Sequence, residues 1–303
     1  LNESKYILIE FPMNQSLHYI EDIVCGYAVA NVFEAVSLRN NGISKPILAL
    51  SYHKSEYELC KKYDIAVSIS SPMNYSHGLK YHIAVDTGMN RSGVKGVNSL
   101  LSLVNCMRAS DIVGVYSHIY SPNKLLADSQ KEKFLDAVRY VKLHNRDIVT
   151  HLFASNYVSN QENCSTDIVR LGIGLYDNAL AVTTSVLQVK EVKKGESIGY
   201  DGEFIADKSM KIALCEGGYF DGVIRPFKGH KMGFNTDFCK VLGKISMDSF
   251  VIDVTDRWAK SGDQIVIYDT DNLSFEERER DLHISKYELM TALKGRFNYV
   301  YYN

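Results

Sequence analysis

Polar side chains stand where several apolar, strand-like runs of this sequence end. In a parallel α/β barrel the carboxyl ends of the strands meet at one mouth, so polar residues at these ends form a single site. The candidates are Glu10, Asn31, Asp86 with Arg91 beyond it, His118, Ser155 with Asn156, and Arg170. Carboxylates, an imidazole and guanidinium groups gathered at one mouth can transfer protons and bind anions.

The last two of these runs predict a phosphate site. In α/β barrels the loops after the seventh and eighth strands often bind a phosphate group. Here they supply Ser155 and the glycines Gly172 and Gly174, and glycine lets the backbone approach an anion closely. We therefore expect a phosphorylated ligand.

The elements that must position these residues alternate between short β-rich runs and helical patterns. The β-rich runs are 7–10, 27–30, 46–50, 65–69, 82–86, 113–118, 148–153 and 168–176. Such alternation predicts parallel βα units, and eight of them predict a TIM-type (β/α)8 barrel. Segment 71–80 contains Pro and Gly and has no helical period, so we do not expect a helix there.

Beyond residue 178 the pattern changes to strand-like runs without long helices between them. These runs are 186–192, 211–215, 240–245, 250–254 and 264–268, followed by one helical stretch at 284–295. The predicted fold is thus α/β, with an eight-stranded barrel over 1–180 and a C-terminal β-rich domain over 181–303.

Composition excludes several classes of partner. The 303 residues carry a net charge of −2 with 46% hydrophobic and 23% charged residues, and Lys and Arg are dispersed, so neither nucleic acid nor a membrane surface is an expected partner. The six cysteines form no CxxC pair or Cys/His cluster, so we expect no metal site. No window is apolar enough for a membrane span and the start lacks a signal-peptide pattern, which predicts a cytoplasmic location.

One string then resembles a known family. HIAVDTGMNRSG is similar to the HLKxDTGMxRLG segment of alanine racemases, pyridoxal-phosphate enzymes built from a barrel and a β-domain. Further similar segments follow in the family's order: YAVANVFEAVSLRNNGISKPILAL, GVYSHIYSPN, DIVRLGIGLYD, GESIGYDGEFIA, GGYFDGVIR and GKISMDSF. We therefore identify the sequence as a member of the alanine racemase family.

The resemblance implies racemisation of a small amino acid and a set of catalytic residues. Tyr200 matches the tyrosine that moves the α-proton on one face of the substrate. His118 matches the histidine beside the cofactor ring, and Arg91 matches the arginine that bonds the phenolic oxygen of the cofactor. Arg170 matches the arginine that faces the pyridine nitrogen, where a permanent cation keeps that nitrogen unprotonated.

The resemblance also implies the remaining binding residues. Ser155, with the backbone amides of Gly172 and Ile173, matches the phosphate cradle. The substrate-facing loops contain Tyr219, Met247 and Asp248, and in the family these loops and the catalytic tyrosine come from the other subunit of a head-to-tail homodimer. We therefore expect a homodimer that binds a small amino acid.

The sequence departs from the family where the first strand ends. Family members carry there the lysine that forms the Schiff base, whereas strand register places Glu10 at this position and Asn14 at that of a phosphate-binding tyrosine. A rival alignment uses Lys5 but turns the apolar run 7–9 into a loop. Ala84 and Gly295 replace two further family residues. Pyridoxal phosphate is therefore expected to bind without a covalent link or to be absent, in a member shortened at its start.

Other interpretations remain open. Taken alone, Tyr200 and His118 are as readily packing residues, and Arg170 could form a structural ion pair with Asp86 or Glu10. Glu10 and Asp86 could also form a glycosidase pair, which the distance between the carboxyls would decide. The main alternative is a noncatalytic paralogue that keeps the fold for cofactor or amino-acid binding or for regulation, because a retained tyrosine alone cannot supply proton transfer on both faces.

Overall fold

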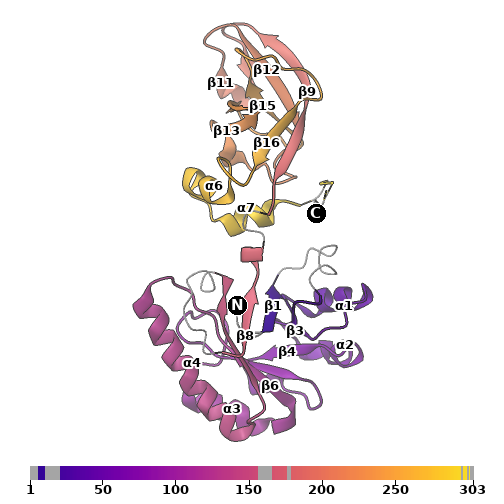
Figure 1. Cartoon of the computed structure of the whole chain (residues 1–303), viewed down its shortest axis with the longest axis vertical. Helices are drawn as coiled ribbons and strands as arrows, with labels where there is room; N and C mark the ends of the chain where they lie inside the picture. Colours follow the sequence, from indigo (N-terminus) through magenta and orange to yellow (C-terminus); the bar gives the residue numbers. More distant parts are fainter. Residues whose placement is uncertain are drawn as a thin grey trace. The chain divides into compact units, whose positions relative to one another are not determined.

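The structure is a computed structural model that describes residues 21–155, 166–175, 179–294, 296–298 and 300, and the backbone alone of residues 6–10. The chain divides into two compact units, Leu1–Leu175 and Tyr176–Asn303, which we call unit 1 and unit 2 and describe separately (Figure 1). The domain limits 1–180 and 181–303 stay a prediction.

Eight parallel strands close a barrel in unit 1, and this confirms the predicted architecture. They pair in chain order, and β8 returns to β1. The strands are β1 (Tyr6–Glu10), β2 (Gly26–Val29), β3 (Ile47–Ala49), β4 (Ala66–Ile69), β5 (Tyr81–Ala84), β6 (Ile112–Tyr116), β7 (Val149–Ala154) and β8 (Ile168–Leu171). Parallel pairing places all their carboxyl ends at one mouth.

Helices flank this barrel (Figure 1). They are α1 (Val32–Asn40), α2 (Tyr57–Lys62), α3 (Val97–Cys106) and α4 (Lys124–His144), with 3-10 turns η2 (Lys54–Glu56), η3 (Pro72–Asn74), η4 (Ala109–Asp111) and η5 (Ile173–Leu175). The Asn31 side chain caps α1 by accepting from the Glu34 amide at 3.0 Å, while Glu34 accepts from the Ala30 amide. Segment 71–80 forms only η3, as its Pro and Gly predicted.

One position inside the barrel must be glycine, because a neighbouring side chain occupies the space of its Cβ atom. A Cβ atom at Gly114 would lie 2.2 Å from the Nδ1 atom of His82. These residues are paired in register on β6 and β5, so the missing side chain makes room for the imidazole. The barrel interior therefore accommodates a buried histidine.

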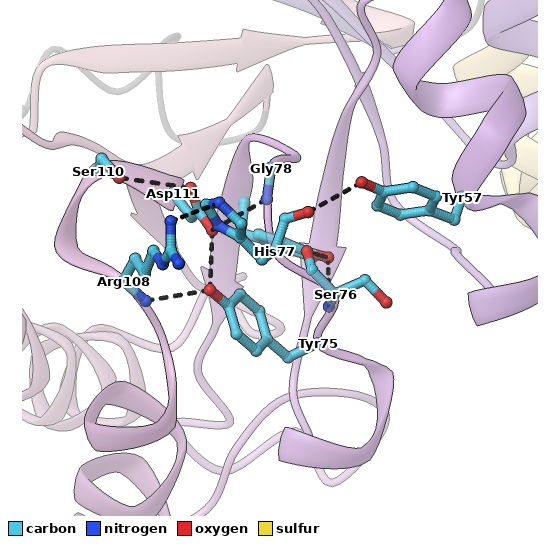
Figure 2. A network of polar contacts seen from close by, with 9 residues as sticks. Tyr57, Tyr75, Ser76, His77, Gly78, Arg108, Ser110 and Asp111 are labelled. Atoms are coloured by element: carbon cyan, nitrogen blue, oxygen red, sulfur yellow. Dashed lines mark hydrogen bonds and ion pairs between the residues drawn. The ribbon is translucent and has the colours of Figure 1, made fainter.

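A polar network ties together two connections of unit 1 (Figure 2). The carboxylate of Asp111, which is 6% exposed, accepts from the Tyr75 hydroxyl at 2.8 Å, the His77 ring at 2.9 Å and the Gly78 amide at 3.2 Å. The Tyr75 hydroxyl in turn accepts from the Arg108 amide. This network, which we call the Asp111 network, joins the segment before β5 to the turn before β6.

Unit 2 is a second closed barrel, with antiparallel strands in the order β12–β15–β14–β13–β16–β9. The strands are β9 (Val182–Val192), β12 (Met210–Glu216), β13 (Lys231–Phe234), β14 (Asp237–Leu242), β15 (Ser249–Asp253) and β16 (Gln264–Tyr268), with a ribbon of β10 (Ser197–Ile198) and β11 (Phe204–Ile205). The five predicted strands are present. Strands β10, β11 and β13 were not predicted.

Short helical elements complete unit 2: η6 (Tyr200–Gly202), η7 (Arg225–Phe227), α6 (Phe275–Leu282) and α7 (Lys286–Ala292). The helix expected over 284–295 is α7, which is shorter, and α6 was not predicted. Arg278 of α6 is fully buried, donates to the carbonyls of Lys231 and Ile267, and lies over the Phe227 ring. Its burial anchors α6 to the second barrel.

No helix in the described residues is both long and apolar enough to cross a membrane. Those residues also contain no group of three or more His, Cys, Asp or Glu side chains able to hold a metal ion.

Candidate active site

A cavity of about 790 Å³ lies at the carboxyl ends of the unit 1 strands. Among the residues that line it are Glu34, Ser51, Asp86, Thr87, Arg91, Tyr116, Ser117, His118 and Arg170. The cavity thus gathers side chains from α1, β6, β8 and the loops that follow β3, β5 and β6. Four of the predicted site residues, Asp86, Arg91, His118 and Arg170, are brought together here.

Arg170 is the most deeply buried charged group of this cavity, with 1% of its surface exposed. Its Nη2 atom donates to the Ser117 carbonyl at 2.8 Å and toward the His118 Nδ1 atom at 3.4 Å. Its Nη1 atom donates to the His151 Nδ1 atom at 2.8 Å. These bonds fix the plane of the guanidinium group, because its donors have a rigid forked geometry.

The hydrogen bond from Arg170 also determines the protons of two buried histidines. Burial and the positive charge of Arg170 lower the pKa of His151 well below its usual value, and the same two causes lower that of His82 to about 4. Since the neutral His151 accepts at Nδ1, its proton lies on Nε2, which donates to the His82 Nδ1 atom at 2.9 Å. A chain of hydrogen bonds from Arg170 to His151 to His82 therefore links β8, β7 and β5.

Arg91 is held by a loop that folds back onto the end of β5. The Asp86 side chain accepts from the amides of Gly88 and Asn90, and the Asp86 and Val94 backbones bond across the loop. A Cβ atom at Gly93 would lie 2.5 Å from the Asp86 amide nitrogen, so this close return requires glycine. Asp86 thus shapes the loop that presents Arg91.

Gln130 of α4 couples this loop to the one that contains His118. Its amide nitrogen donates to the Thr87 hydroxyl at 2.9 Å and to the His118 carbonyl at 3.0 Å. The side chain is buried, so these hydrogen bonds do not compete with water. Gln130 therefore bonds two predicted site loops at once, one through the Thr87 hydroxyl and the other through the His118 backbone carbonyl.

The predicted phosphate cradle has donors that converge on one oxygen. The Ser155 hydroxyl accepts from the Gly172 amide at 3.0 Å and from the Gly174 amide at 3.2 Å. Ile173 is buried and begins the turn η5 between these two amides. Backbone N–H groups that point at a common oxygen form an anion-binding concavity.

Unit 2 presents Tyr200 on a strained turn. The residue is 63% exposed and begins η6, in which Asp201 has a φ of +60°. Lys244 forms ion pairs with Asp201 at 2.5 Å and with Glu203 at 3.0 Å. These contacts hold the turn and leave the phenol accessible.

Tyr219, Met247 and Asp248 lie together on two adjoining loops of unit 2, and Tyr219 and Met247 are 41% and 47% exposed. The Tyr219 amide donates to the Ser246 carbonyl at 3.0 Å, and the Phe220 amide donates to the Met247 carbonyl at 3.1 Å. The loops therefore form one surface. The four predicted residues of unit 2 belong to a different unit from the barrel residues, and their role stays a prediction.

The departure at the first strand is seen in the backbone alone. β1 ends at Glu10, which pairs in register with Ala28. The side chain of Glu10, together with Lys5, Asn14, Asn156 and Gly295, lies outside the described residues. The glycosidase pair of Glu10 and Asp86 is therefore not tested.

Sequence reasoning missed three buried polar residues of this site: His82, His151 and Gln130. A signal existed for the two histidines, since each interrupts an otherwise apolar strand. Gln130 gave none, because it stands among the charged residues of a long helix.

Comparison with known proteins gives consistent matches over residues 13–301. The family profile for the alanine racemase N-terminal domain matches residues 13–178, and that for the alanine racemase C-terminal domain matches residues 179–301. Alanine racemase of Ligilactobacillus salivarius is 28% identical over 75% of this chain and 70% of its own length. That of Staphylococcus epidermidis is 27% identical over 91% of this chain and 81% of its own.

Solved structures show the same fold. Alanine racemase from Bacillus anthracis with bound L-Ala-P matches with a TM-score of 0.84 at 23% identity, over 95% of this chain and 86% of that one. Alanine racemase from Streptomyces lavendulae matches with a TM-score of 0.86 at 20% identity, over 96% of this chain and 89% of its own.

Proposed function

Because the chain belongs to the alanine racemase family, we propose that it racemises a small amino acid with pyridoxal phosphate as cofactor. The observation that supports this most strongly is the buried guanidinium of Arg170, held in a fixed plane beside the cavity. Burial of a cation at that place costs desolvation free energy. A hydrogen bond from this cation to the ring nitrogen of the cofactor would explain why it is buried there.

The described residues fit this cofactor. Arg170 offers a donor to the ring nitrogen, Arg91 offers one to the phenolic oxygen, and the amides of Gly172 and Gly174 already converge on an oxygen. A cation, a second cation and backbone N–H groups match an ester with two anionic ends. When bound, pyridoxal phosphate supplies an electron sink that acidifies the α-carbon of an amino acid.

The residues of this chain then have distinct tasks. Arg170 would donate to the ring nitrogen and leave that atom without a proton of its own, because a guanidinium group has N–H donors and no acceptor. This weakens the electron sink and favours return of the proton to the α-carbon over side reactions. Tyr200 moves that proton on one face through its phenolic oxygen.

We further propose that Tyr200 acts in a homodimer. The tyrosine is exposed on unit 2, and the family resemblance implies that it serves the barrel of a second copy. Tyr219, Met247 and Asp248 would then face the amino acid together with it.

The test is α-proton exchange of alanine in deuterium oxide, together with formation of the opposite enantiomer. We expect wild-type protein with added pyridoxal phosphate to catalyse both, and Tyr200→Phe to lower the rate by about a hundredfold or more, since the phenol can no longer carry a proton. Tyr140→Phe, which alters another exposed tyrosine, is the control. Equal rates in wild type and Tyr200→Phe would exclude Tyr200.

A second candidate function is supported by the end of β1, where Glu10 stands in place of a lysine. A protein without that lysine can bind the cofactor or the amino acid without racemising it. Borohydride treatment together with α-proton exchange separates the two functions, because borohydride fixes only a cofactor that lysine holds covalently. If no cofactor is fixed to lysine and no α-proton exchanges, the second candidate function is supported.

A further inference from the structure

The two loops of unit 2 that carry Tyr219, Met247 and Asp248 are joined by one arginine from the C-terminal segment. Arg296 donates from Nε to Asp221 Oδ1 at 2.8 Å and from Nη2 to Asp221 Oδ2 at 2.7 Å. The same Nη2 atom lies 2.8 Å from Asp248 Oδ1. One guanidinium group thus bonds both the loop of Tyr219 and the loop of Met247.

The carboxylate of Asp221 is the better fixed of the two partners. Asp221 is 6% exposed and also accepts from the Gly218 amide at 3.1 Å. The hydrogen bond from Arg296 lowers the pKa of Asp221, so the buried group is an anion at neutral pH. A two-pronged bond between planar groups restricts orientation as well as distance.

The backbones of these segments approach one another as closely as their glycines allow. A Cβ atom at Gly218 would lie 2.3 Å from the carbonyl oxygens of Ser246 and Met247, and one at Gly222 would lie 2.6 Å from the Ala292 carbonyl oxygen. Three segments that are distant in sequence are therefore in backbone contact.

Arg296 is itself anchored on both sides. Its guanidinium group lies 5.0 Å from the centre of the Phe220 ring, and the next residue, Phe297, packs against the hydrophobic core of unit 2. The cation therefore reaches the loops from a fixed base.

We propose that Arg296 is a positioning residue, which sets the placement of the Tyr219 and Met247 loops relative to each other and so the affinity for the amino acid. This inference rests on the proposed function. Arg296 acts on the substrate through the two loops, so its loss affects binding more than the proton transfer itself.

The test combines loop protection with kinetics in the full-length protein. In Arg296→Gln we expect the amides of Tyr219 and Phe220, which donate to the opposite loop, to exchange with deuterium about tenfold faster, while those of β12 and β15 are unchanged. KM for alanine should rise about tenfold and kcat should change by less than about threefold.

Two further variants calibrate the result. Arg296→Lys keeps the charge but cannot form the two-pronged bond, so its KM should fall between wild type and Arg296→Gln. Arg280→Gln removes an exposed arginine of the same unit that pairs with Glu277, and it should leave both readouts unchanged.

Three outcomes would overturn the proposal. Unchanged exchange at Tyr219 and Phe220 would show that Arg296 does not hold the loops. Equal acceleration in β12 and β15 would show a general loss of stability. Faster amide exchange in the loops with an unchanged KM would show that the placement of the loops does not set the affinity for the amino acid. If wild-type protein does not racemise alanine, the proposed function fails on its own, and amide exchange still decides whether Arg296 fixes the loops.

Discussion

Gly114 controls the polar interior of the barrel by lacking a side chain. The His82 ring occupies the space that a Cβ atom at Gly114 would need. The Nδ1 atom of that ring, which lies closest to the added Cβ, is also the atom bonded to His151, and His151 is bonded to Arg170. A side chain added at Gly114 must therefore displace the His82 ring and disturb its hydrogen bond to His151.

We expect Gly114→Ala to lower the free energy of unfolding by about 1–3 kcal/mol, because overpacking a closed interior forces neighbouring groups from their positions. Urea denaturation measures the loss. His82→Ala removes the obstacle, so the double variant should be more stable than the sum of the two single changes predicts. Strictly additive effects would mean that His82 is not the group displaced.

The sequence indicated that Arg170, a cation within an apolar strand, needs hydrogen-bonding partners. It did not indicate which residues those partners are. His82 and His151 lie on β5 and β7, and the spacing of strands along the chain does not show which side chains of neighbouring strands meet inside the barrel. Pattern reasoning therefore predicts which residue needs partners and leaves the partners to the closed structure.

Single elements of unit 1 are secured by local polar contacts, and the Asp111 network is the clearest (Figure 2). Burial of the Asp111 carboxyl opposes its ionisation, but hydrogen bonds from His77, Tyr75 and the Gly78 amide outweigh it and lower the pKa below the ordinary 3.8. The folded state thus favours the carboxylate more than the unfolded chain does.

Asp111→Asn should lower the free energy of unfolding at neutral pH by about 1–3 kcal/mol, the usual range for losing hydrogen bonds to a charged group. A lowered pKa contributes stability above the unfolded value, and this contribution is lost as pH falls through the lower folded value. The difference between wild type and variant should therefore shrink below pH 3.8. Unfolding at several pH values measures it, and a difference that is constant with pH would contradict this assignment.

Among the secondary-structure elements, sequence patterns predicted the eight barrel strands of unit 1 but did not predict helix α6. Eight apolar runs predicted eight barrel strands, because buried parallel strands are apolar on both faces. The sequence of α6, FEERERDL, resembles a solvated charge run. It folds as a helix because Ser274 caps it and Arg278 is buried against backbone carbonyls, which composition does not reveal.

For the whole molecule, the barrel and the β-rich unit have separate hydrophobic cores, and each carries part of the proposed site. The sequence motifs assigned residues to both units, but whether a tyrosine acts on its own barrel or on that of a second copy is a property of the assembly, which motif spacing does not encode.

Mixed dimers test this assignment. We expect Arg91→Ala and Tyr200→Phe each to be nearly inactive, and their co-expression to restore about one quarter of wild-type activity. Half of the dimers are then mixed, and each mixed dimer has one site with both native residues. If the tyrosine acts within its own chain, co-expression will restore no activity. A monomer in sedimentation experiments would also contradict the assignment.

The order of donors and acceptors from Arg170 through His151 to His82 has an electrical consequence. Both rings turn a lone pair toward the cation and an N–H away from it, so their dipoles add in series. They stabilise the charge of the guanidinium group, as oriented water molecules stabilise an ion in solution. On this side the guanidinium charge is therefore stabilised by protein dipoles.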